Sequence, residues 1–377
     1  MSTSRFPRMS LGMLILSTLT ALGTAAPPLS AQGLKLAAGD VGLGIGDVPR
    51  LDGLRLNFRD GELQRVRGIN ATLWDPYGDA YGGSVRGIAL GLPLTGARDI
   101  EGLGIGVGVS ADRNLSGIGV GVLGLGSGGE LSGVMVGGLG MGAGDGMSGI
   151  MIGGLGAGSG GDLRGALIGG LGGGVSGDIR GLAAGGVGVG AGGDVSGILL
   201  GGVGAGASGH VRGIMIGGVG GGAGQGLSGV GIGGIGVGTG GDSKGLLIGG
   251  LGVGAGGDLT GVAIGGVGVG AAGEIKGLAI GGMGVGARAM TGVSIGLGFG
   301  AQDINALVIA PAYFKAIEDG TMRGVSVSAF NRTLGRQNGL TIGILNIADE
   351  LHGVQVGLIN IAKNKARYRV MPFVNWN

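Results

Sequence analysis

The residues Gly252, Gly254 and Gly257 spell G-x-G-x-x-G, the spacing with which a glycine-rich loop cradles the phosphates of a dinucleotide. That chemistry requires a strand before the loop, a helix after it and one such loop in each binding unit. Here the spacing recurs, for example at 156–161, and the segment after Gly257 has no helical periodicity. We therefore expect neither nucleotide nor cofactor binding, and glycine at this spacing needs another explanation.

A second candidate for chemistry is a row of carboxylates that recur at a constant interval or at a multiple of it. The row consists of Glu130, Asp162, Asp178, Asp194, Asp242, Asp258 and Glu274. Glycine-rich repeats with aspartate bind calcium in β-rolls, but those repeats read G-G-x-G-x-D-x-U-x and are shorter. One carboxylate per repeat supplies few ligands. We predict no metal site, and instead a solvated turn residue whose side chain hydrogen-bonds to its own backbone.

Groups for acid-base or nucleophilic catalysis are scarce. The chain has 2 histidines and no cysteine. His210 takes the place of an aspartate in a turn, and His352 lies beside a glycine, so neither has a base or nucleophile as an evident partner. We expect no catalytic residues and a protein that is not an enzyme.

The one irregular polar and aromatic segment is TLWDPYGDAYGG at 72–83. Trp74, Tyr77 and Tyr81 on such a loop are able to stack on a sugar or on a partner surface, which makes them the candidate partner-binding residues. The alternative is a cap that covers an exposed end or side of the fold. The sequence favours the cap and leaves the binding loop open.

Glycine also sets the organisation of the whole chain. Of 377 residues, 106 are glycine, and an anchor glycine recurs at a constant interval from Gly117 through Gly133 to Gly277. Such a fixed period is the signature of a repeat protein. With the anchor as offset 0, the unit reads G-[IVL]-x-[IV]-G-G-[LV]-G-[VA]-G-[AS]-G-G-[DE]-[LIV]-[SRK]. We divide the chain into a signal peptide (1–31), an N-terminal cap with degenerate repeats (32–116), the glycine-rich array (117–292), and C-terminal degenerate repeats with a cap (293–377).

Within a unit, apolar residues fall at offsets 1 and 3, at 6, 8 and 10, and at 14. A spacing of two is the period of a β-strand, and the parity changes at Gly-Gly and Gly-Gly-Asp, where we expect corners. This predicts an all-β fold, an elongated β-solenoid of about 15–16-residue coils in which these apolar side chains point inward. Offset 7 is glycine in the array, as at Gly252, and Asn331, Asn346 and Asn360 in the C-terminal units, which predicts a positive φ there.

An antiparallel meander or outer-membrane β-barrel, with one strand and one turn per unit, is the alternative fold. It would explain why the residue before the anchor alternates between basic and neutral, as in Arg212, Ser228 and Lys244. Against it, no aromatic residue occurs at 82–298, whereas barrels carry aromatic girdles. The solenoid is the favoured fold, and a membrane is an expected partner only in the barrel alternative.

The N-terminal segment 1–31 has the pattern of a secretory signal peptide. Arg5 and Arg8 precede an apolar run to about Leu22, and small residues follow up to Ala31. Cleavage there would start the mature chain at Gln32 and, because two of the 25 basic residues are removed, leave 23 basic and 23 acidic residues. A chain without net charge is not expected to bind nucleic acid. We predict an exported bacterial protein that is extracellular, at the cell surface, or in the periplasm or outer membrane.

The C-terminal units GLTIGILNIADELHGVQVGLINIAKN (339–364) and the ending RVMPFVNW (369–376) resemble bacterial exported surface-repeat proteins built on G-[LV]-Q-[IV]-G-[LF]-[IV]-N. The resemblance is specific over 339–376 and weaker at the N-terminal anchors. The array departs from it, because glycine stands where the family has asparagine. The resemblance implies export and a surface location, and it implies no chemistry.

Glycine at outward positions would leave flat faces that are almost free of side chains, which a second sheet can approach closely. We therefore predict a non-enzymatic structural or surface-interaction protein, acting in adhesion or self-assembly. Its expected partner is another copy, bound through glycine-rich faces, or a cell-surface polymer.

Overall fold

A computed structural model describes residues 33–74, 82–317 and 319–377, which form strands and turns without any helix. The predicted signal peptide, Tyr77 and Tyr81 lie outside these residues. The chain divides into two compact units, unit 1 (1–186) and unit 2 (187–377). The division falls within the predicted glycine-rich array.

The strands of unit 1 are β1 (Leu34–Ala38), β2 (Val41–Ile45), β3 (Arg50–Arg59), β4 (Arg65–Trp74), β5 (Ser84–Gly91), β6 (Leu94–Ser127), β7 (Glu130–Gly137), β8 (Gly140–Ala143), β9 (Gly146–Gly153), β10 (Gly156–Ser159), β11 (Asp162–Gly169), β12 (Gly172–Val175) and β13 (Ile179–Gly185). The strands of unit 2 are β14 (Gly188–Ala191), β15 (Val195–Gly201), β16 (Gly204–Ala207), β17 (His210–Gly217), β18 (Gly220–Ala223), β19 (Gly226–Gly233), β20 (Gly236–Thr239), β21 (Ser243–Gly249), β22 (Gly252–Ala255), β23 (Leu259–Gly265), β24 (Gly268–Ala271), β25 (Glu274–Gly281), β26 (Gly284–Gly286), β27 (Ala289–Ile295), β28 (Gly298–Ala301), β29 (Asp303–Ile309), β30 (Tyr313–Ala316), β31 (Thr321–Val327), β32 (Phe330–Gln337), β33 (Leu340–Leu351), β34 (Val354–Ala362) and β35 (Val370–Trp376).

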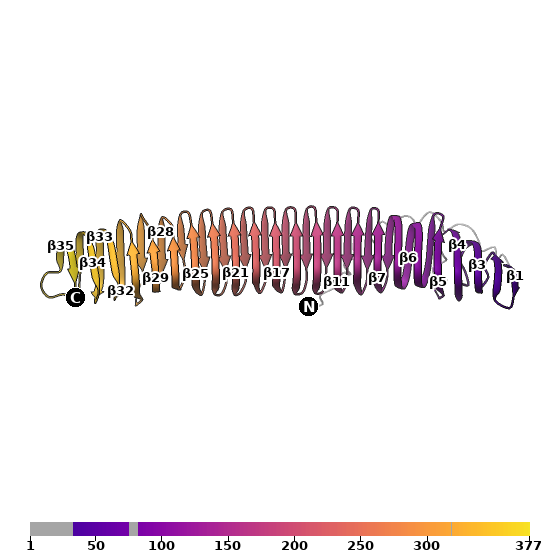
Figure 1. Ribbon diagram of the computed structural model, residues 1–377, viewed down its shortest axis with the longest axis horizontal. Coiled ribbons are helices and arrows are strands. Elements are labelled where there is room, and N and C mark those ends of the chain that lie inside the picture. The colour runs from indigo at the N-terminus through magenta and orange to yellow at the C-terminus, as the bar shows by residue number, and fades with distance from the viewer. Residues whose placement is uncertain (1–32, 75–81, 318) are drawn as a thin grey trace, which may run out of the picture. The chain divides into compact units, whose positions relative to one another are not determined.

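From β7 onward, each coil of the array contains one long and one short strand. In unit 2, the long strand β21 is followed by a turn, the short strand β22, a second turn and the next long strand, β23. Long strands pair with long strands and short strands with short strands, in parallel, so that Gly245 lies opposite Gly261 and Gly252 opposite Gly268. Figure 1 shows these strands stacked side by side within each unit. The prediction of an all-β solenoid with coils of about 16 residues is confirmed.

The alternative fold, an antiparallel meander or barrel, requires each strand to pair in the opposite direction with the strand that follows it. In the array each strand instead pairs in the same direction with the strand one coil away, as β19 does with β21. The meander and the barrel are therefore wrong for the array. Antiparallel pairs are found between β1 and β2 in unit 1 and between β34 and β35 in unit 2.

Four inward positions form the core of each array coil, at offsets 2, 8, 10 and 14. In the coil that starts at Gly245 they are Leu247, Val253, Ala255 and Leu259, all of which are buried. Leu247 and Leu259 come from long strands, and Val253 and Ala255 come from the short strand between them. The core therefore lies between the sheet of long strands and the sheet of short strands.

The other apolar positions of the coil point outward, and the prediction that offsets 1, 3 and 6 point inward is wrong. Leu246 and Ile248 flank the buried Leu247 on the same strand and lie on its opposite side. Leu251, at offset 6 in the turn, is 55% exposed. Because successive residues of a strand alternate between its two faces, the variable offset 2 and the apolar offsets 1 and 3 cannot share one face.

Offset 2 varies in sequence because it shares a narrow core with offset 8. Where offset 2 is Met215, offset 8 is Gly221, and a Cβ on this glycine would lie 3.1 Å from the methionine Cε. In the next coil the small residue is at offset 2 and the larger one at offset 8. Offset 2 is Gly231, and a Cβ on it would lie 3.1 Å from Cγ1 of Val237 at offset 8. Pairing a large residue with a small one keeps the core filled while the backbones stay in register.

The anchor glycines are required because stacked backbones approach closely at offset 0. Gly245 has a φ of 121°, and a Cβ on it would lie 2.1 Å from the carbonyl oxygen of Gly229 in the preceding coil. Gly252, at offset 7, lies in β22 and has no φ in the left-handed region. The predicted positive φ at offset 7 is therefore wrong, and the anchor itself is the residue with a positive φ.

Candidate interaction surfaces

The outer side of the long strands carries two rows of aliphatic residues, at offsets 1 and 3, which together we call the apolar face. In unit 2 the row at offset 3 is Leu200, Ile216, Ile232, Ile248, Ile264, Ile280, Ile295, Ile309 and Val327. The row at offset 1 is Ile198, Ile214, Val230, Leu246, Val262, Leu278, Val293, Leu307 and Val325. Parallel register places the members of each row directly opposite one another, about 4.8 Å apart. This face was not predicted from the sequence, because both rows were assigned to the core.

The turn after each long strand adds a third apolar row, at offset 6. In unit 2 this row is Val187, Val203, Val219, Ile235, Leu251, Val267 and Met283, and Leu297 continues it at offset 5 of a shorter corner; these residues are 43% to 65% exposed. In unit 1 it is Leu123, Leu139, Leu155 and Leu171, also exposed. Single exposed apolar residues are normal, whereas contiguous exposed rows mark interaction surfaces.

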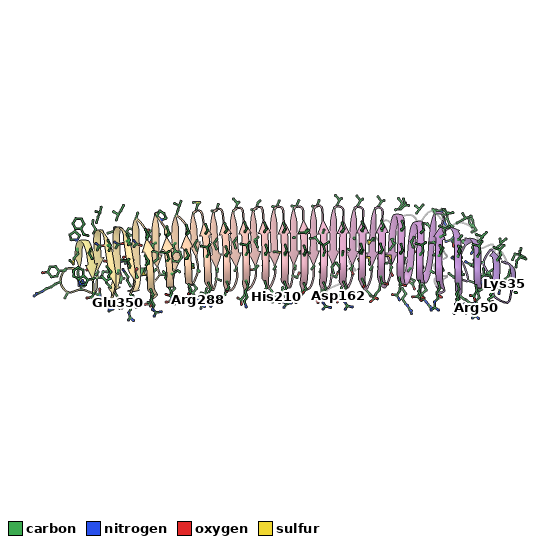
Figure 2. All side chains as sticks on the ribbon, viewed as in Figure 1. Lys35, Arg50, Asp162, His210, Arg288 and Glu350 are labelled. Carbon is green, nitrogen blue, oxygen red and sulfur yellow. The ribbon has the colours of Figure 1, made fainter. Side chains whose placement is uncertain are left out.

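The opposite corner, between the short strand and the next long strand, is polar. Figure 2 shows His210 and Arg288 at this corner in unit 2. Here aspartate carboxylates act between coils. Asp162 Oδ1 accepts a hydrogen bond from the backbone N–H of Asp178 at 3.0 Å, and Asp258 Oδ1 accepts one from the N–H of Glu274 at 2.8 Å. Each such carboxylate links one coil to the next.

Basic residues at offset 15 lie beside these carboxylates. Lys276 Nζ lies 3.0 Å from Glu274 Oε2, and a guanidinium nitrogen of Arg212 lies 3.6 Å from Asp194 Oδ2. The Thr291 hydroxyl donates to Glu274 Oε1 at 2.7 Å, and this bond, together with Lys276, lowers the pKa of the Glu274 carboxyl below its ordinary 4.5. Positive and negative charges therefore compensate each other locally at this corner.

The bond between coils at Asp258 leads to a test of the stacking. Substituting Asp258→Ala removes the acceptor of the Glu274 N–H, and we expect a loss of about 1 kcal/mol of unfolding free energy. Asp258→Asn is the matched control, because its amide oxygen can still accept the bond. Urea unfolding and hydrogen exchange at the Glu274 amide measure the two effects. Equal stability and exchange in the two variants would contradict a role for this bond.

The outer side of the short strands, at offsets 7 and 9, is bare glycine through most of the array, and we call it the glycine face. A Cβ on Gly238 or Gly254 would have no heavy atom within 4 Å. In the C-terminal coils the position of Gly298 is taken by Tyr313 and then Phe330, whose rings stack with centroids 5.4 Å apart. Short strands thus accept large side chains here, so the packing of the coil does not require glycine on this face.

Asparagines form a buried ladder in the C-terminal coils of unit 2. Asn331 Nδ2 donates to Asn346 Oδ1 at 2.7 Å, and Asn346 Nδ2 donates to Asn360 Oδ1 at 2.7 Å. In the strand register these residues continue the inward row of Phe299 and Phe314, and none of them has a positive φ. The predicted positive φ at these asparagines is therefore wrong. They form a hydrogen-bonded core.

Unit 1 contains a second buried polar network, centred on Arg55. The Arg55 side chain is fully buried, donates to Asp47 Oδ1 at 2.7 Å and Asn70 Oδ1 at 2.9 Å, and forms an ion pair with the buried Asp60. Asp60 also accepts hydrogen bonds from Asn57 Nδ2 and from the Thr72 hydroxyl. All five partners lie within one small region of the chain, and the network holds neighbouring coils together.

The described residues among those that the sequence singled out lie on separate strands and turns. Trp74 is 43% exposed at the end of β4, and the binding-loop prediction for Tyr77 and Tyr81 lies outside the described residues. His352 is exposed in the turn before β34. Of the described residues, no group of three or more His, Asp or Glu is placed to hold a metal ion.

The G-x-G-x-x-G segment has the surroundings of a coil. Gly252 and Gly254 belong to β22, and Gly257 lies in the turn that leads to the strand β23, where a dinucleotide loop would have a helix. Within 33–74, 82–317 and 319–377, no helix is long and apolar enough to span a membrane.

No protein-family model, curated protein or solved structure matches this chain. The resemblance of residues 339–376 to exported surface-repeat proteins stays a prediction.

Proposed function

We propose that the protein is an exported, non-enzymatic structural repeat protein that works by surface contact. The observation that carries the proposal is the sidedness of the coil. Every coil of the array repeats an apolar face, an apolar corner, a glycine face and a polar corner in the same order. Stacked in register within each unit, these positions form continuous surfaces, and repeat proteins bind through such extended surfaces.

Surface contact fits the distribution of polar groups better than catalysis does. An active site needs different groups that converge on one place. In the described residues, the carboxylates of the polar corner bond to the next coil, and the Arg55 network and the asparagine ladder are buried and hydrogen-bonded internally. These groups stabilise the stack, and the outward rows are left to meet a partner.

Export is supported by the N-terminal pattern of 1–31. A thiol-free chain that is stabilised by stacked coils needs no disulfide outside the cell. The expected location is the cell surface or its surroundings. The expected partner is another copy or a cell-surface polymer.

Cell fractionation with sequencing of the mature N-terminus tests this proposal. We expect the chain outside the cytoplasm, beginning at Gln32, and we expect the purified protein to bind intact cells, isolated cell-surface polymer or itself. Leu14→Arg with Leu16→Arg is the export control, because charge in the apolar run should hold the chain inside the cell. A chain that keeps residues 1–31 in the cytoplasm and binds none of these partners would refute the proposal.

A further inference from the structure

We infer that the apolar face of unit 2 is an interface between two copies of this chain, packed face to face about a twofold axis. The inference rests on the proposed function and names the partner for one of its surfaces. If the apolar face proves not to join two copies, the proposed binding to a cell-surface polymer still stands, because fractionation and polymer binding are measured in separate experiments.

The size of the face is the first argument. Nine stacked residues in each row span roughly 38 Å, and the two rows with their side chains are about 13 Å wide. The area of the apolar face is therefore on the order of 500 Å². A patch of this size lies at the upper end of what a monomer exposes. Two copies would together bury on the order of 1,000 Å², before the rims are counted, which reaches the size of a specific interface.

The shape of the face is the second argument. The rows at offsets 1 and 3 form two parallel ridges with a groove between them, and a twofold-related copy presents the same ridges and groove. Sheets pack about 10 Å apart when such ridges interdigitate. The row at offset 3 is mostly isoleucine, as at Ile216, Ile248 and Ile280. Its branched side chains have few rotamers, so little side-chain entropy is lost when they pack.

Charge is the third argument, and it favours a second copy over a lipid surface. Two of the basic residues beside the apolar face have carboxylates as neighbours, with 3.0 Å between Lys276 and Glu274 and 3.6 Å between Arg212 and Asp194. Such pairs leave little positive potential to attract anionic headgroups. They sit at the rim of the proposed interface, where charged groups remain solvated.

Sedimentation velocity of the purified full chain tests the inference at concentrations up to about 100 µM, well above the micromolar Kd expected for an interface of this size. The apolar-face variant combines Ile216→Lys, Ile248→Lys and Ile280→Lys. The matched control combines Gly222→Lys, Gly238→Lys and Gly254→Lys, which adds the same charge to the glycine face at positions with room for a side chain. We expect a dimer for the wild type and the control, and a Kd at least 100-fold weaker for the apolar-face variant.

A milder variant, with threonine at the same three isoleucine positions, keeps the strand preference and guards against a folding defect in the lysine variant. We expect it to fold, as judged by circular dichroism, and to dimerise more weakly than the wild type. Three results would overturn the inference: a monomeric wild type, an apolar-face variant that folds and still dimerises, or a glycine-face control that becomes monomeric. Binding of a monomeric wild type to phosphatidylcholine–phosphatidylglycerol vesicles, lost in the apolar-face variant, would assign the face to lipid instead.

Discussion

Substituting Gly245→Ala is expected to destabilise the coils around it by at least about 3 kcal/mol. Gly245 has a φ of 121°, which an alanine adopts only with strain. The new Cβ would also lie 2.1 Å from the carbonyl oxygen of Gly229, a backbone atom that is fixed by the neighbouring coils. Neither conflict is relieved without separating β19 from β21, so the ladder should open at this point.

Gly254→Ala is the matched control in the same coil. Its Cβ would have open space, and alanine costs less backbone entropy than glycine, so we expect no loss and a gain of up to about 1 kcal/mol. Because repeat proteins unfold in parts, hydrogen exchange across β19, β21 and β23 should accompany urea unfolding. If Gly245→Ala were as stable as Gly254→Ala, the close stacking at the anchor would be wrong.

Substituting Arg55→Met is expected to cost about 3–5 kcal/mol in unit 1. The change leaves Asp60 fully buried without its cation and leaves Asn70 Oδ1 without its donor from Arg55. Loss of a single partner from a buried ion pair is far more costly than loss of an exposed pair, because the remaining charge is not solvated.

The double variant Arg55→Met with Asp60→Asn is the control for the Arg55 network. It removes both charges, so we expect it to recover part of the stability lost in the single variant. Thermal unfolding and limited proteolysis of unit 1 report the difference. A single variant that loses less than about 1 kcal/mol, or a double variant that is less stable than the single one, would contradict the buried charge pair.

The coil could be predicted from the sequence because its period is strict. Anchor glycines at a constant interval, such as Gly245 and Gly261, fix the stacking register, and these two residues do lie opposite each other. The Gly-Gly pairs and the Gly-Gly-Asp segments mark turns, as at Gly250 and Asp258. Spacing alone was enough to place these two turns of the array coil.

Spacing was not enough to decide which side of a strand faces the core. Offset 3 is strongly apolar, as at Ile248, and offset 2 is often small, as at Gly231 or Ala263, yet offset 3 is outward and offset 2 is inward. The signal that could have resolved this is the exchange of sizes between offsets 2 and 8, as in Met215 with Gly221. Such compensation occurs only where two side chains share one space.

The candidate surfaces were predicted only in part, because spacing did not show which side of each strand faces the core. Glycine on the outer side of the short strands was expected from the sequence, and Gly238 and Gly254 lie there. The apolar face was not expected, because its residues had been assigned to the core. The inward position of the asparagine ladder was also not expected, since the corner after the long strand is one residue shorter in the coil of Asn331 than in the array and shifts the count of offsets. Val327 and Phe330 are three residues apart, whereas the equivalent Ile280 and Gly284 are four residues apart.

Cysteine cross-linking tests the central claim, that copies of this chain meet through the apolar face, most directly. The chain has no cysteine, so a single introduced thiol reports one position without background. Ile248→Cys lies on the apolar face and Gly254→Cys lies on the glycine face of the same coil. With a short bismaleimide, we predict a covalent dimer for Ile248→Cys and none for Gly254→Cys. A dimer from Gly254→Cys alone, or from neither variant, would contradict the account.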